Sequence, residues 1–261
     1  MLEIKDLTIQ YGDKLPVVEN FSLSLKKGEI ITIVGESGSG KSTVLSSILG
    51  LLPNGGKIIS GDIIYNGNSM LSKSLNQWRE LRGTEITMIS QDSGGTLNPI
   101  RKIGKQFVEY IQTHSKMSAK EAEEKAKDMF SKVNLPDPEI IMKSYPHQLS
   151  GGMKQRVGIA MALTFHPKII LADEPTSALD VITQAQIVKE IMDLRKKFDT
   201  SIIMVTHNLG VAAYISDKII VMQNGKIVDA GNKNEVIENP KSDYTKKLLA
   251  AVPEIGGERL V

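Results

Sequence analysis

The apolar positions of this chain follow two patterns along its length. Residues 2–9 and 21–25 alternate apolar and polar side chains, which is typical of strands with one face in a core. Residues 30–34 form a continuous and mostly β-branched run, as expected of a strand covered on both faces in a parallel sheet. We predict strands, in chain order, over residues 2–9, 21–25, 30–34, 58–65, 85–90, 168–172, 201–205 and 218–222.

Helical spacing marks several segments between these strands. A helix is predicted from Thr43 to Leu52, ended by the turn residues Pro53-Asn54-Gly55-Gly56. Residues 103–142 place apolar side chains at helical spacing among charged residues and alanines, which predicts a helical insertion. Prolines interrupt the chain before a further predicted helix over residues 153–165. Strands that alternate with helices predict an α/β fold with a mostly parallel sheet and helices on both faces.

Composition excludes several classes of protein. The chain has 261 residues, enough for one large α/β domain or for a core with a subdomain. Its 32 basic and 30 acidic residues give a net charge of +2, so nucleic acid is not the expected partner. Because there is no cysteine, disulfides and thiolate metal sites are excluded. The four histidines are scattered, so the sequence predicts no zinc cluster.

The sequence predicts no direct route into or across a membrane. The first residues are charged and lack the apolar run of a signal peptide, so we do not expect export by that route. The longest apolar stretches, such as residues 157–165, fall short of the roughly 18 to 20 residues that span a bilayer. Any membrane role is therefore expected to depend on a partner protein.

A glycine-rich string joins the predicted strand 30–34 to the helix that follows it. The string, Gly35-Glu36-Ser37-Gly38-Ser39-Gly40-Lys41-Ser42, fits the pattern Gly-x4-Gly-Lys-Ser/Thr, in which backbone N–H groups wrap the phosphates of a nucleotide. We predict that Lys41 neutralises the β- and γ-phosphate oxygens and that Ser42 ligates the bridging magnesium ion. The predicted cofactors are ATP and Mg2+. The alternative is a chance glycine-rich turn.

Two adjacent acids end the apolar strand predicted before Pro175. Asp173 is predicted to hold magnesium, directly or through water, and Glu174 to polarise an attacking water molecule. This position suits both roles because α/β sheets bind ligands at the carboxyl ends of their strands. The alternative is that these acids cap the helix after Pro175.

Three further residues gain a role from this context. Gln91 follows a predicted strand and is a candidate for contact with magnesium and the attacking water, with a solvated turn glutamine as the alternative. His207 closes another strand and is a candidate for contact with the γ-phosphate, with a structural histidine as the alternative. Tyr11 is a candidate for stacking on adenine, against ordinary packing.

A second glycine string, from Leu149 to Gln155, lies about 110 positions after the first. Ser150, Gly151 and Gly152 offer backbone donors just before a helical stretch, an arrangement suited to another phosphate. One nucleotide does not need two phosphate cradles from the same chain. The sequence therefore predicts that a second copy or partner completes each site.

With these motifs the chain resembles the nucleotide-binding subunits of ABC transporters over essentially its whole length. The resemblance implies a Walker A loop, a Walker B aspartate (Asp173), a catalytic glutamate (Glu174), a Q-loop glutamine (Gln91), a switch histidine (His207) and an adenine-stacking tyrosine (Tyr11). It also implies a signature at residues 149–155 and a D-loop at residues 177–180, which brings Asp180 to the nucleotide. The implied Walker A residues are Gly35, Glu36, Ser37, Gly38, Ser39, Gly40, Lys41, Ser42 and Thr43.

The resemblance further implies a P-loop NTPase (RecA-like) core, an antiparallel β subdomain and an inserted α-helical subdomain. Residues 1–261 are expected to form one ABC ATPase domain. Within it, residues 1–90 and 158–235 are expected to form the α/β core with the β subdomain. Residues 91–157 are expected to form the helical subdomain with the signature, and residues 236–261 a C-terminal helix and tail.

The family arrangement implies a set of partners. These are a second ABC ATPase subunit in a head-to-tail dimer, two transmembrane permeases and, indirectly, an extracytoplasmic substrate-binding protein, which places the chain at the cytoplasmic face of the membrane. The segment from Gln91 to Pro99, which leads into the helical insertion, is expected to receive a permease helix, with Leu97 or Ile100 in contact with it.

The peptide and nickel importer branch is the one that the chain resembles most. The segments that carry this likeness are residues 91–99, 145–148 and 239–249, although the last departs from the usual His-Pro-Tyr-Thr at Ser242 and Asp243. The absence of cysteine favours the shorter nickel or metal-chelate type, and the cargo itself is not readable. The alternatives are DNA-associated ATPases, which need a long coiled coil between the two strings, and translation-associated ATPases, which carry two cassettes in tandem.

Overall fold

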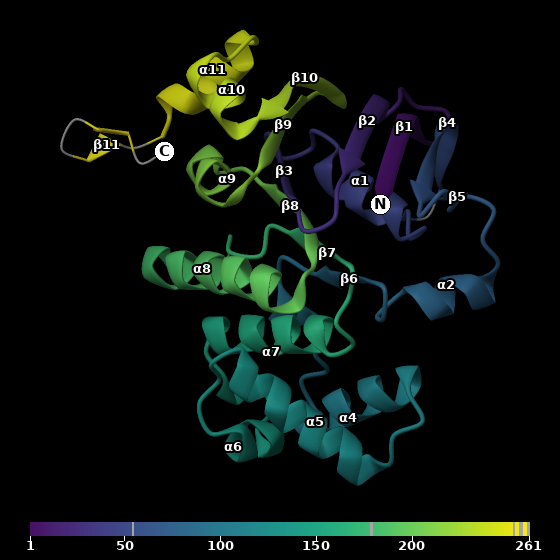
Figure 1. Ribbon diagram of the computed structural model, residues 1–261, viewed down its shortest axis with the longest axis vertical. Helices are drawn as coiled ribbons and strands as arrows, with labels where there is room; N and C mark the ends of the chain where they lie inside the picture. Colours follow the sequence, from purple (N-terminus) through teal and green to yellow (C-terminus); the bar gives the residue numbers. More distant parts are fainter. Residues whose placement is uncertain (54, 178–179, 253, 256–257, 260–261) are drawn as a thin grey trace. The chain divides into compact units, whose positions relative to one another are not determined.

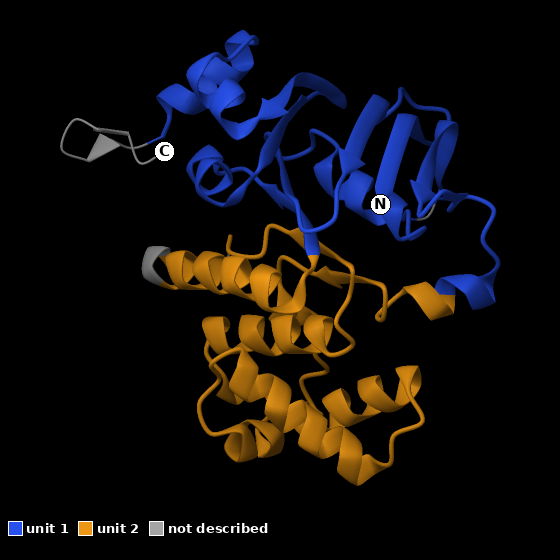
Figure 2. Ribbon diagram, in the orientation of Figure 1, with its two compact units in different colours: residues 1–78, 201–261 blue, residues 79–200 orange. Residues whose placement is uncertain are grey.

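The computed structural model describes residues 1–53, 55–177, 180–252, 254–255 and 258–259. The chain forms two compact units (Figure 2). Unit 1 comprises Met1–Trp78 and Ser201–Val261, and unit 2 comprises Arg79–Thr200. Helix α2 (Leu75–Leu81) contains the boundary between the first segment of unit 1 and unit 2.

Unit 1 contains an antiparallel sheet with the strand order β2-β1-β4-β5 (Figure 1). Strand β1 (Leu2–Tyr11) pairs with β2 (Val18–Leu25) on one side and with β4 (Gly56–Tyr65) on the other. The tight turn Asn66-Gly67, with both residues at positive φ, joins β4 to the short strand β5 (Asn68–Ser69). One face of β1 and β2 is buried, in agreement with their alternating sequence.

The second sheet of unit 1 is built around β3 (Ile30–Val34), which is buried along its whole length. It pairs in parallel with β8 (Ser201–Thr206) and with β9 (Lys218–Gln223). An antiparallel strand, β10 (Lys226–Asn232), adds to the free side of β9. Both edges of β3 are paired, and its side chains are buried on both faces, which explains its continuous apolar sequence.

The helices of unit 1 follow its strands. Helix α1 (Lys41–Ile48) follows β3, and α9 (Leu209–Ile215) joins β8 to β9. After β10 come α10 (Lys233–Glu238) and α11 (Asp243–Ala250). An apolar cluster joins α9, α10 and α11 to the ends of β3 and β9, and it contains Val34, Leu209, Ala212, Ile219, Val221, Val236 and Leu249. The chain continues into the two-residue strands β11 (Glu254–Ile255) and β12 (Glu258–Arg259), which pair with each other.

Unit 2 combines two parallel strands with a group of helices. Strand β6 (Ile86–Ile89) pairs with β7 (Ile169–Asp173). The connection between them contains α3 (Ser93–Thr96), α4 (Ile103–His114), α5 (Ala119–Lys132), α6 (Pro138–Lys143), a short 3-10 turn (Pro146–Gln148) and α7 (Gly151–Leu163). Helix α8 (Val181–Phe198) follows β7.

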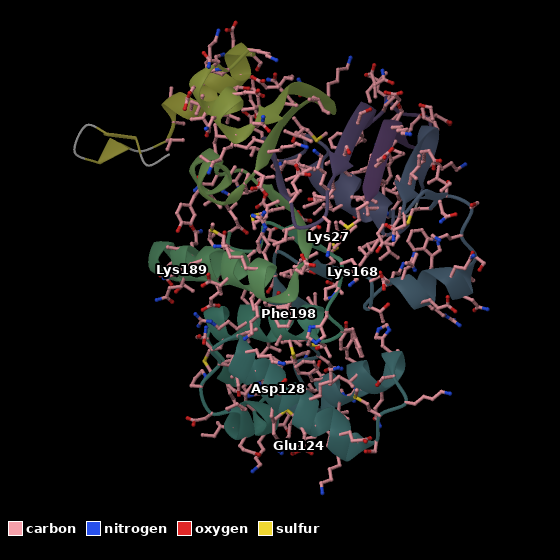
Figure 3. All side chains as sticks on the ribbon, in the orientation of Figure 1. Lys27, Glu124, Asp128, Lys168, Lys189 and Phe198 are labelled. Carbon is pink, nitrogen blue, oxygen red and sulfur yellow. The ribbon has the colours of Figure 1, made fainter. Side chains whose placement is uncertain are left out.

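Helix α5 shows how unit 2 divides its apolar and charged residues. Its buried side carries Ala122, Ala126, Met129 and Phe130. The ring of Phe130 packs against that of Phe107 in α4, with 5.2 Å between the two ring centroids. Lys127 pairs with Glu124 at 3.2 Å, and Lys132 pairs with Asp128 at 2.6 Å. Figure 3 labels the two acidic residues, Glu124 and Asp128, on this helix. The predicted helical insertion is confirmed as α4, α5 and α6.

The predicted α/β fold with mostly parallel strands is confirmed, and the structure also contains the expected antiparallel sheet. Several bounds were wrong. Helix α1 runs from Lys41 to Ile48 rather than from Thr43 to Leu52, and α7 runs from Gly151 to Leu163 rather than over residues 153–165. Strand β2 begins at Val18 rather than at Phe21. The predicted end of α1 at residues 53–56 includes Asn54, which lies outside the described residues. The subdomain bounds at residues 91–157 and 236–261 stay predictions.

In the part of the chain that the structure describes, no helix combines the length and the apolar character needed to cross a membrane.

Candidate nucleotide-binding site

The glycine-rich string forms the loop between β3 and α1, as predicted. Gly38 and Gly40 have φ values of +82° and +98°, a left-handed conformation that favours glycine. A side chain at Gly40 would also lie 2.7 Å from the carbonyl oxygen of Val17, so residue 40 must be glycine for two independent reasons. The loop thus brings its backbone close to neighbouring strands at Gly40, whereas a Cβ at Gly38 would meet no atom within 4 Å.

Lys41 lies inside this loop, with only 4% of its surface exposed. Its Nζ donates hydrogen bonds to the carbonyl oxygens of Gly35 and Glu36, both at 2.7 Å, and approaches Ser39 Oγ at 3.4 Å. The loop therefore holds an ammonium group at the start of α1. These contacts orient the ammonium group within the loop, and a lysine ammonium group suits an anionic ligand.

The N-terminus of α1 is suited to the same ligand. Among the described residues no side chain caps this helix, and its first turn contains no acidic residue. Uncapped N–H groups and the positive end of a helix dipole favour a phosphate. Ser42 is exposed in this first turn, next to Lys41. The residues present therefore fit the predicted nucleotide phosphates.

Parallel pairing brings His207 to the edge of the sheet where the loop begins. Val34, the last residue of β3, pairs with Thr206, the last residue of β8. The next residues are Gly35 and His207, so both leave the sheet at the same edge. His207 is exposed, and the following Asn208 caps α9 by accepting from the N–H of Gly210 at 2.9 Å.

Tyr11 is the last residue of β1 and is half-buried. It pairs with Gly56 of β4, where a side chain would come within 2.7 Å of the Tyr11 ring. This contact is ordinary packing of the ring on a glycine. Stacking of Tyr11 on adenine stays a prediction.

In unit 2 the strands β6 and β7 bring Gln91, Asp173 and Glu174 to one edge. Ile89 pairs in parallel with Ala172, so the chain leaves both strands at the same end. Gln91 is exposed two residues after Ile89, and Asp173 is half-buried as the last residue of β7. Within the described residues no group of three or more histidines and acids is placed so that it could hold a metal ion. A magnesium site here would instead combine few protein ligands with phosphate oxygens, as is usual for this ion.

Glu174 has a left-handed backbone with φ at +43°, which is uncommon for a residue other than glycine. Its carbonyl oxygen accepts from the N–H and the hydroxyl of Ser177, both at 3.2 Å, so a tight turn holds it. The helix-cap alternative for the two acids is wrong, because α8 begins only at Val181 and its cap is Asp180.

Asp180 accepts hydrogen bonds from the N–H of Thr183 at 3.0 Å and from its hydroxyl at 2.7 Å. The carboxylate thus has a structural role as the N-cap of α8. The predicted D-loop at residues 177–180 includes residues 178 and 179, which lie outside the described residues. Contact of Asp180 with a nucleotide stays a prediction.

Ser150, Gly151 and Gly152 form the start of α7. Ser150 caps the helix by accepting from the N–H of Met153 at 3.3 Å, and the two glycines are its first helical residues. Ser150 and Gly151 are exposed, and a side chain at Gly152 would lie 2.9 Å from Thr183. The start of α7 thus presents backbone N–H groups on the surface with little side-chain cover.

Two residues near these motifs were missed by the sequence analysis. Asp92 caps α3 by accepting from the N–H of Gly95 at 2.9 Å, and so orders the chain after Gln91. Asp before a glycine pair is a turn signal that was available in the sequence. Tyr244 of α11 accepts a hydrogen bond from the N–H of Glu36 in the glycine loop at 2.9 Å. No local pattern predicts a contact between residues 208 positions apart.

The glycine loop with its buried lysine, at the end of a parallel strand and the start of a helix, defines a P-loop nucleotide-binding protein. A family model described as "ABC transporter" matches residues 18–177. The chain belongs to the ABC transporter family, and it is an ATP hydrolase of that family.

Similar proteins cover nearly the whole chain. It is 44% identical to the oligopeptide transport ATP-binding protein OppD of Bacillus subtilis (strain 168), over 98% of this chain and 72% of that protein. It is 41% identical to the metal-staphylopine import system ATP-binding protein CntD of Staphylococcus aureus (strain NCTC 8325 / PS 47), over 98% of this chain and 94% of that protein. Both names are those of transport subunits, so they do not support the DNA- or translation-associated alternatives.

Solved structures agree with this family. The structure of cbiO1 from Clostridium perfringens, part of the ABC transporter complex cbiONQ, matches with a TM-score of 0.78 and 27% identity, over 91% of this chain and 90% of that one. The dimeric post-hydrolysis state of the ATP-binding cassette MJ0796, bound to ADP and Pi, matches with a TM-score of 0.77 and 29% identity, over 89% of this chain and 99% of that one.

Proposed function

We propose that this chain powers an importer of peptides or metal chelates by binding and hydrolysing ATP. The observation that carries the proposal is the loop after β3, in which a lysine 4% exposed lies beside an uncapped helix start. The two classes of cargo come from the relatives, one named for oligopeptide transport and the other for metal-staphylopine import. The chain would act at the cytoplasmic face of the membrane, through permeases.

The residues of unit 1 would bind the nucleotide. The backbone N–H groups of residues 35–43 would hold the phosphates, and Lys41 would exchange its loop carbonyl partners for phosphate oxygens. Tyr11 would stack on the adenine ring. His207, which leaves the sheet beside the loop, would contact the γ-phosphate.

The metal and the attacking water are assigned to a second set of residues. Ser42, Gln91 and Asp173 would hold a magnesium ion, which when bound neutralises charge on the phosphate oxygens. Glu174 would accept a proton from the attacking water at its carboxylate. The strained turn at Glu174 supports this role, because such strain is concentrated at functional sites.

A second subunit is expected to complete each site. Ser150, Gly151 and Gly152 would bind the γ-phosphate of a nucleotide held by the Walker A loop of the other subunit, and Asp180 would lie near that nucleotide. The exposed start of α7 supports this proposal, because its backbone N–H groups are suited to a phosphate from outside the chain.

Permease docking is assigned to the segment after Gln91. The exposure of Ile100 supports this docking site, because its side chain is 81% exposed. Leu97 does not support the docking site, because it is 6% exposed and therefore belongs to the core of unit 2. A cysteine at Ile100 should form a crosslink with a permease loop in the assembled transporter. Lys246→Cys in α11 is the matched control, and capture from this position alone would contradict the docking site.

The test of the proposed function uses the chain assembled with its permeases in vesicles. ATP-dependent uptake is measured with a labelled peptide and with a nickel chelate. Lys41→Ala should abolish ATP hydrolysis and uptake together, whereas Lys5→Ala, at a lysine side chain 60% exposed on β1, should leave both unchanged. ATP-dependent uptake of either cargo by the Lys41→Ala transporter would contradict the proposed function.

A further inference from the structure

The C-terminal helix α11 contacts the glycine loop through one tyrosine. The backbone N–H of Glu36 donates to the hydroxyl oxygen of Tyr244 at 2.9 Å. Both residues belong to unit 1, although they are 208 positions apart in the sequence. The proposed roles of the loop residues do not include this contact.

The contact acts on a peptide group that also holds Lys41. The N–H of Glu36 and the carbonyl of Gly35 belong to one planar peptide group, in which they point in opposite directions. The carbonyl oxygen accepts from Lys41 Nζ at 2.7 Å, while the N–H donates to Tyr244. This peptide therefore bridges the tyrosine and the lysine, so a rotation of the peptide would move an acceptor of the ammonium group.

The ring of Tyr244 is held beside the root of the loop. It packs against the apolar cluster that contains Val34, the residue before Gly35, and Leu209 and Ala212 of α9. Burial, and to a lesser extent the nearby Glu36 carboxylate, raise the pKa of the Tyr244 hydroxyl, although its hydrogen bond with the Glu36 N–H acts in the opposite direction. The hydroxyl is thus neutral near pH 7 and keeps its proton.

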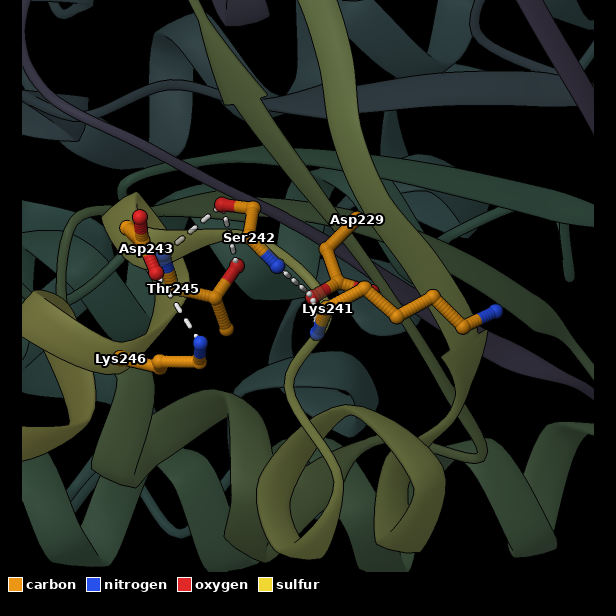
Figure 4. A network of polar contacts seen from close by, with 6 residues as sticks. All are labelled: Asp229, Lys241, Ser242, Asp243, Thr245 and Lys246. Carbon is orange, nitrogen blue, oxygen red and sulfur yellow. Dashed lines mark hydrogen bonds and ion pairs between the residues drawn. The ribbon is translucent and has the colours of Figure 1, made fainter.

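A buried carboxylate fixes the start of α11. Asp229 of β10 is 5% exposed and accepts from the N–H groups of Lys241 at 2.8 Å and Ser242 at 3.3 Å (Figure 4). The pairing of β10 with β9 shifts by one residue between Ile227 and Asp229, and such a bulge redirects the side chains that follow it. Asp229 thus ties the helix to the strand beside β9.

The first turn of α11 is equally ordered. Ser242 caps the helix by accepting from the N–H of Thr245 at 3.1 Å, and Thr245 is fully buried (Figure 4). Tyr244 lies between these two residues, so its position on the helix is determined on both sides. The C-terminal segment is therefore built to hold one hydroxyl at a defined place.

We propose that Tyr244 is a positioning residue for the phosphate-binding loop, through which the C-terminal helix sets the affinity of the site for ATP. The inference rests on the proposed function, because it concerns the same loop. Without the hydroxyl the Gly35–Glu36 peptide would lose one of its two fixed partners. The lysine and the first N–H groups of the loop would then be less ordered before the nucleotide binds. Binding would have to order them, and the free-energy cost of this ordering would lower the affinity for ATP.

The test compares Tyr244→Phe with the wild-type full chain. Phenylalanine keeps the ring in the apolar cluster and removes only the hydroxyl. The dissociation constant for ATP with Mg2+ should rise about 3- to 10-fold, as expected for the loss of one hydrogen bond. The matched control is Tyr214→Phe, at a tyrosine of α9 that is 59% exposed, and it should bind ATP as the wild type does.

A second readout separates positioning from a merely structural role. Amide hydrogen exchange should become faster at Glu36 in Tyr244→Phe, while exchange of the α11 amides and the thermal midpoint stay at their wild-type values.

Two results would overturn the inference. One is an ATP affinity of Tyr244→Phe within measurement error of the wild type, and the other is a weaker affinity accompanied by equal loss of protection throughout α11. A wild-type chain that does not bind ATP would refute the proposed function instead. In that case unchanged exchange at Glu36 in Tyr244→Phe would refute the positioning contact separately.

Discussion

At the residue scale, the site depends on residues whose backbone adopts a left-handed conformation. Glu174 has φ at +43° directly after β7, and Gly40 has φ at +98° directly before α1. At Glu174 this conformation costs free energy, and the turn closed by Ser177 holds it. Gly40 adopts it without that cost, and the nearby Val17 carbonyl leaves no room for a Cβ there.

Glu174→Gln should bind ATP and hydrolyse it slowly. Glutamine has nearly the same shape, so the turn should persist, but the amide does not accept a proton from water. Loss of a general base lowers the rate by about 10² to 10⁴. The measurement is steady-state phosphate release together with equilibrium ATP binding. Glu19→Gln, at a half-buried glutamate of β2, is the control, and a near wild-type rate in Glu174→Gln would exclude the proposed role.

His114 makes the stability of unit 2 sensitive to mild acid. Its ring packs 5.0 Å from that of Tyr110 and 5.7 Å from that of Phe165, and burial lowers its pKa below the ordinary value of 6.5. Burial also raises the pKa of Tyr110 to about 12, which keeps that hydroxyl neutral as it donates to the carbonyl of Gly83. The cluster therefore favours a neutral histidine.

The sign of the pH effect follows from the lowered pKa of His114. Below pH 6.5 the unfolded chain binds more protons than the folded one, so the free energy of unfolding should fall as the pH falls from 7 to 5. Urea titrations should show a smaller fall in His114→Gln. Part of the slope should remain, because burial and neighbouring lysines also lower the pKa of His166. His147→Gln, at an exposed histidine, is the control. If the free energy of unfolding fell with pH as steeply in His114→Gln as in the wild type, this explanation would be refuted.

At the element scale, the ends of the helices are set by short-range hydrogen bonds. Helix α1 stops at Ile48 because Gly50 adopts a left-handed conformation, with φ at +61°. The N–H of Gly50 donates to the carbonyl of Ser47 and the N–H of Leu51 to that of Ser46, which is the Schellman pattern of a helix end. The sequence prediction placed the end at the later proline and passed over this glycine.

Ser118→Ala should lower the free energy of unfolding by about 0.5 to 2 kcal/mol. Ser118 accepts from the N–H of Glu121 at 3.3 Å, and Glu121 accepts in return from the Ser118 N–H at 2.8 Å, which completes a capping box at the start of α5. Ser131→Ala, at an exposed serine in the last turn of the same helix, should change stability by only a few tenths of a kcal/mol. Equal effects of the two substitutions in urea titrations would contradict the role of the cap.

The start of α11 shows why a departure from a family pattern is tolerated. Ser242 and Asp243 stand where His and Pro are usual, and the structure makes them the N-cap and the first residue of α11. Serine is a preferred N-cap, and an acidic residue in the first turn is favoured by the helix dipole, as proline is favoured by its fixed φ. Ser242 and Asp243 are therefore compatible with a helix that begins at this position.

At the scale of the whole molecule, the expected head-to-tail dimer leads to a complementation experiment. Gly151→Asp places a carboxylate at the exposed start of α7, where the helix dipole tolerates it but a phosphate of the other subunit would be repelled. Lys41→Ala disables the other half of the site. Each variant alone should lose ATP hydrolysis, and an equimolar mixture should recover part of it through dimers with one intact composite site. Full activity of Gly151→Asp alone would contradict the proposed sharing of sites.

The sequence by itself determined the features that depend on neighbouring residues. The bounds of β3 were predicted correctly because a strand buried on both faces needs a continuous apolar run. The glycine loop was predicted because its function requires small residues and a lysine at fixed spacing. The helical insertion was predicted because apolar side chains at helical spacing mark α4 and α5.

Only the tertiary structure decided which distant residues meet. Strand β10 was missed because its side chains are mostly half-buried or exposed, and its place depends on the edge of β9 rather than on its own pattern. The hydrogen bond between Glu36 and Tyr244 was equally unreadable. Local propensities act over a few residues, whereas the partner of a backbone N–H 208 positions away is chosen by the packing of strands and helices into one core.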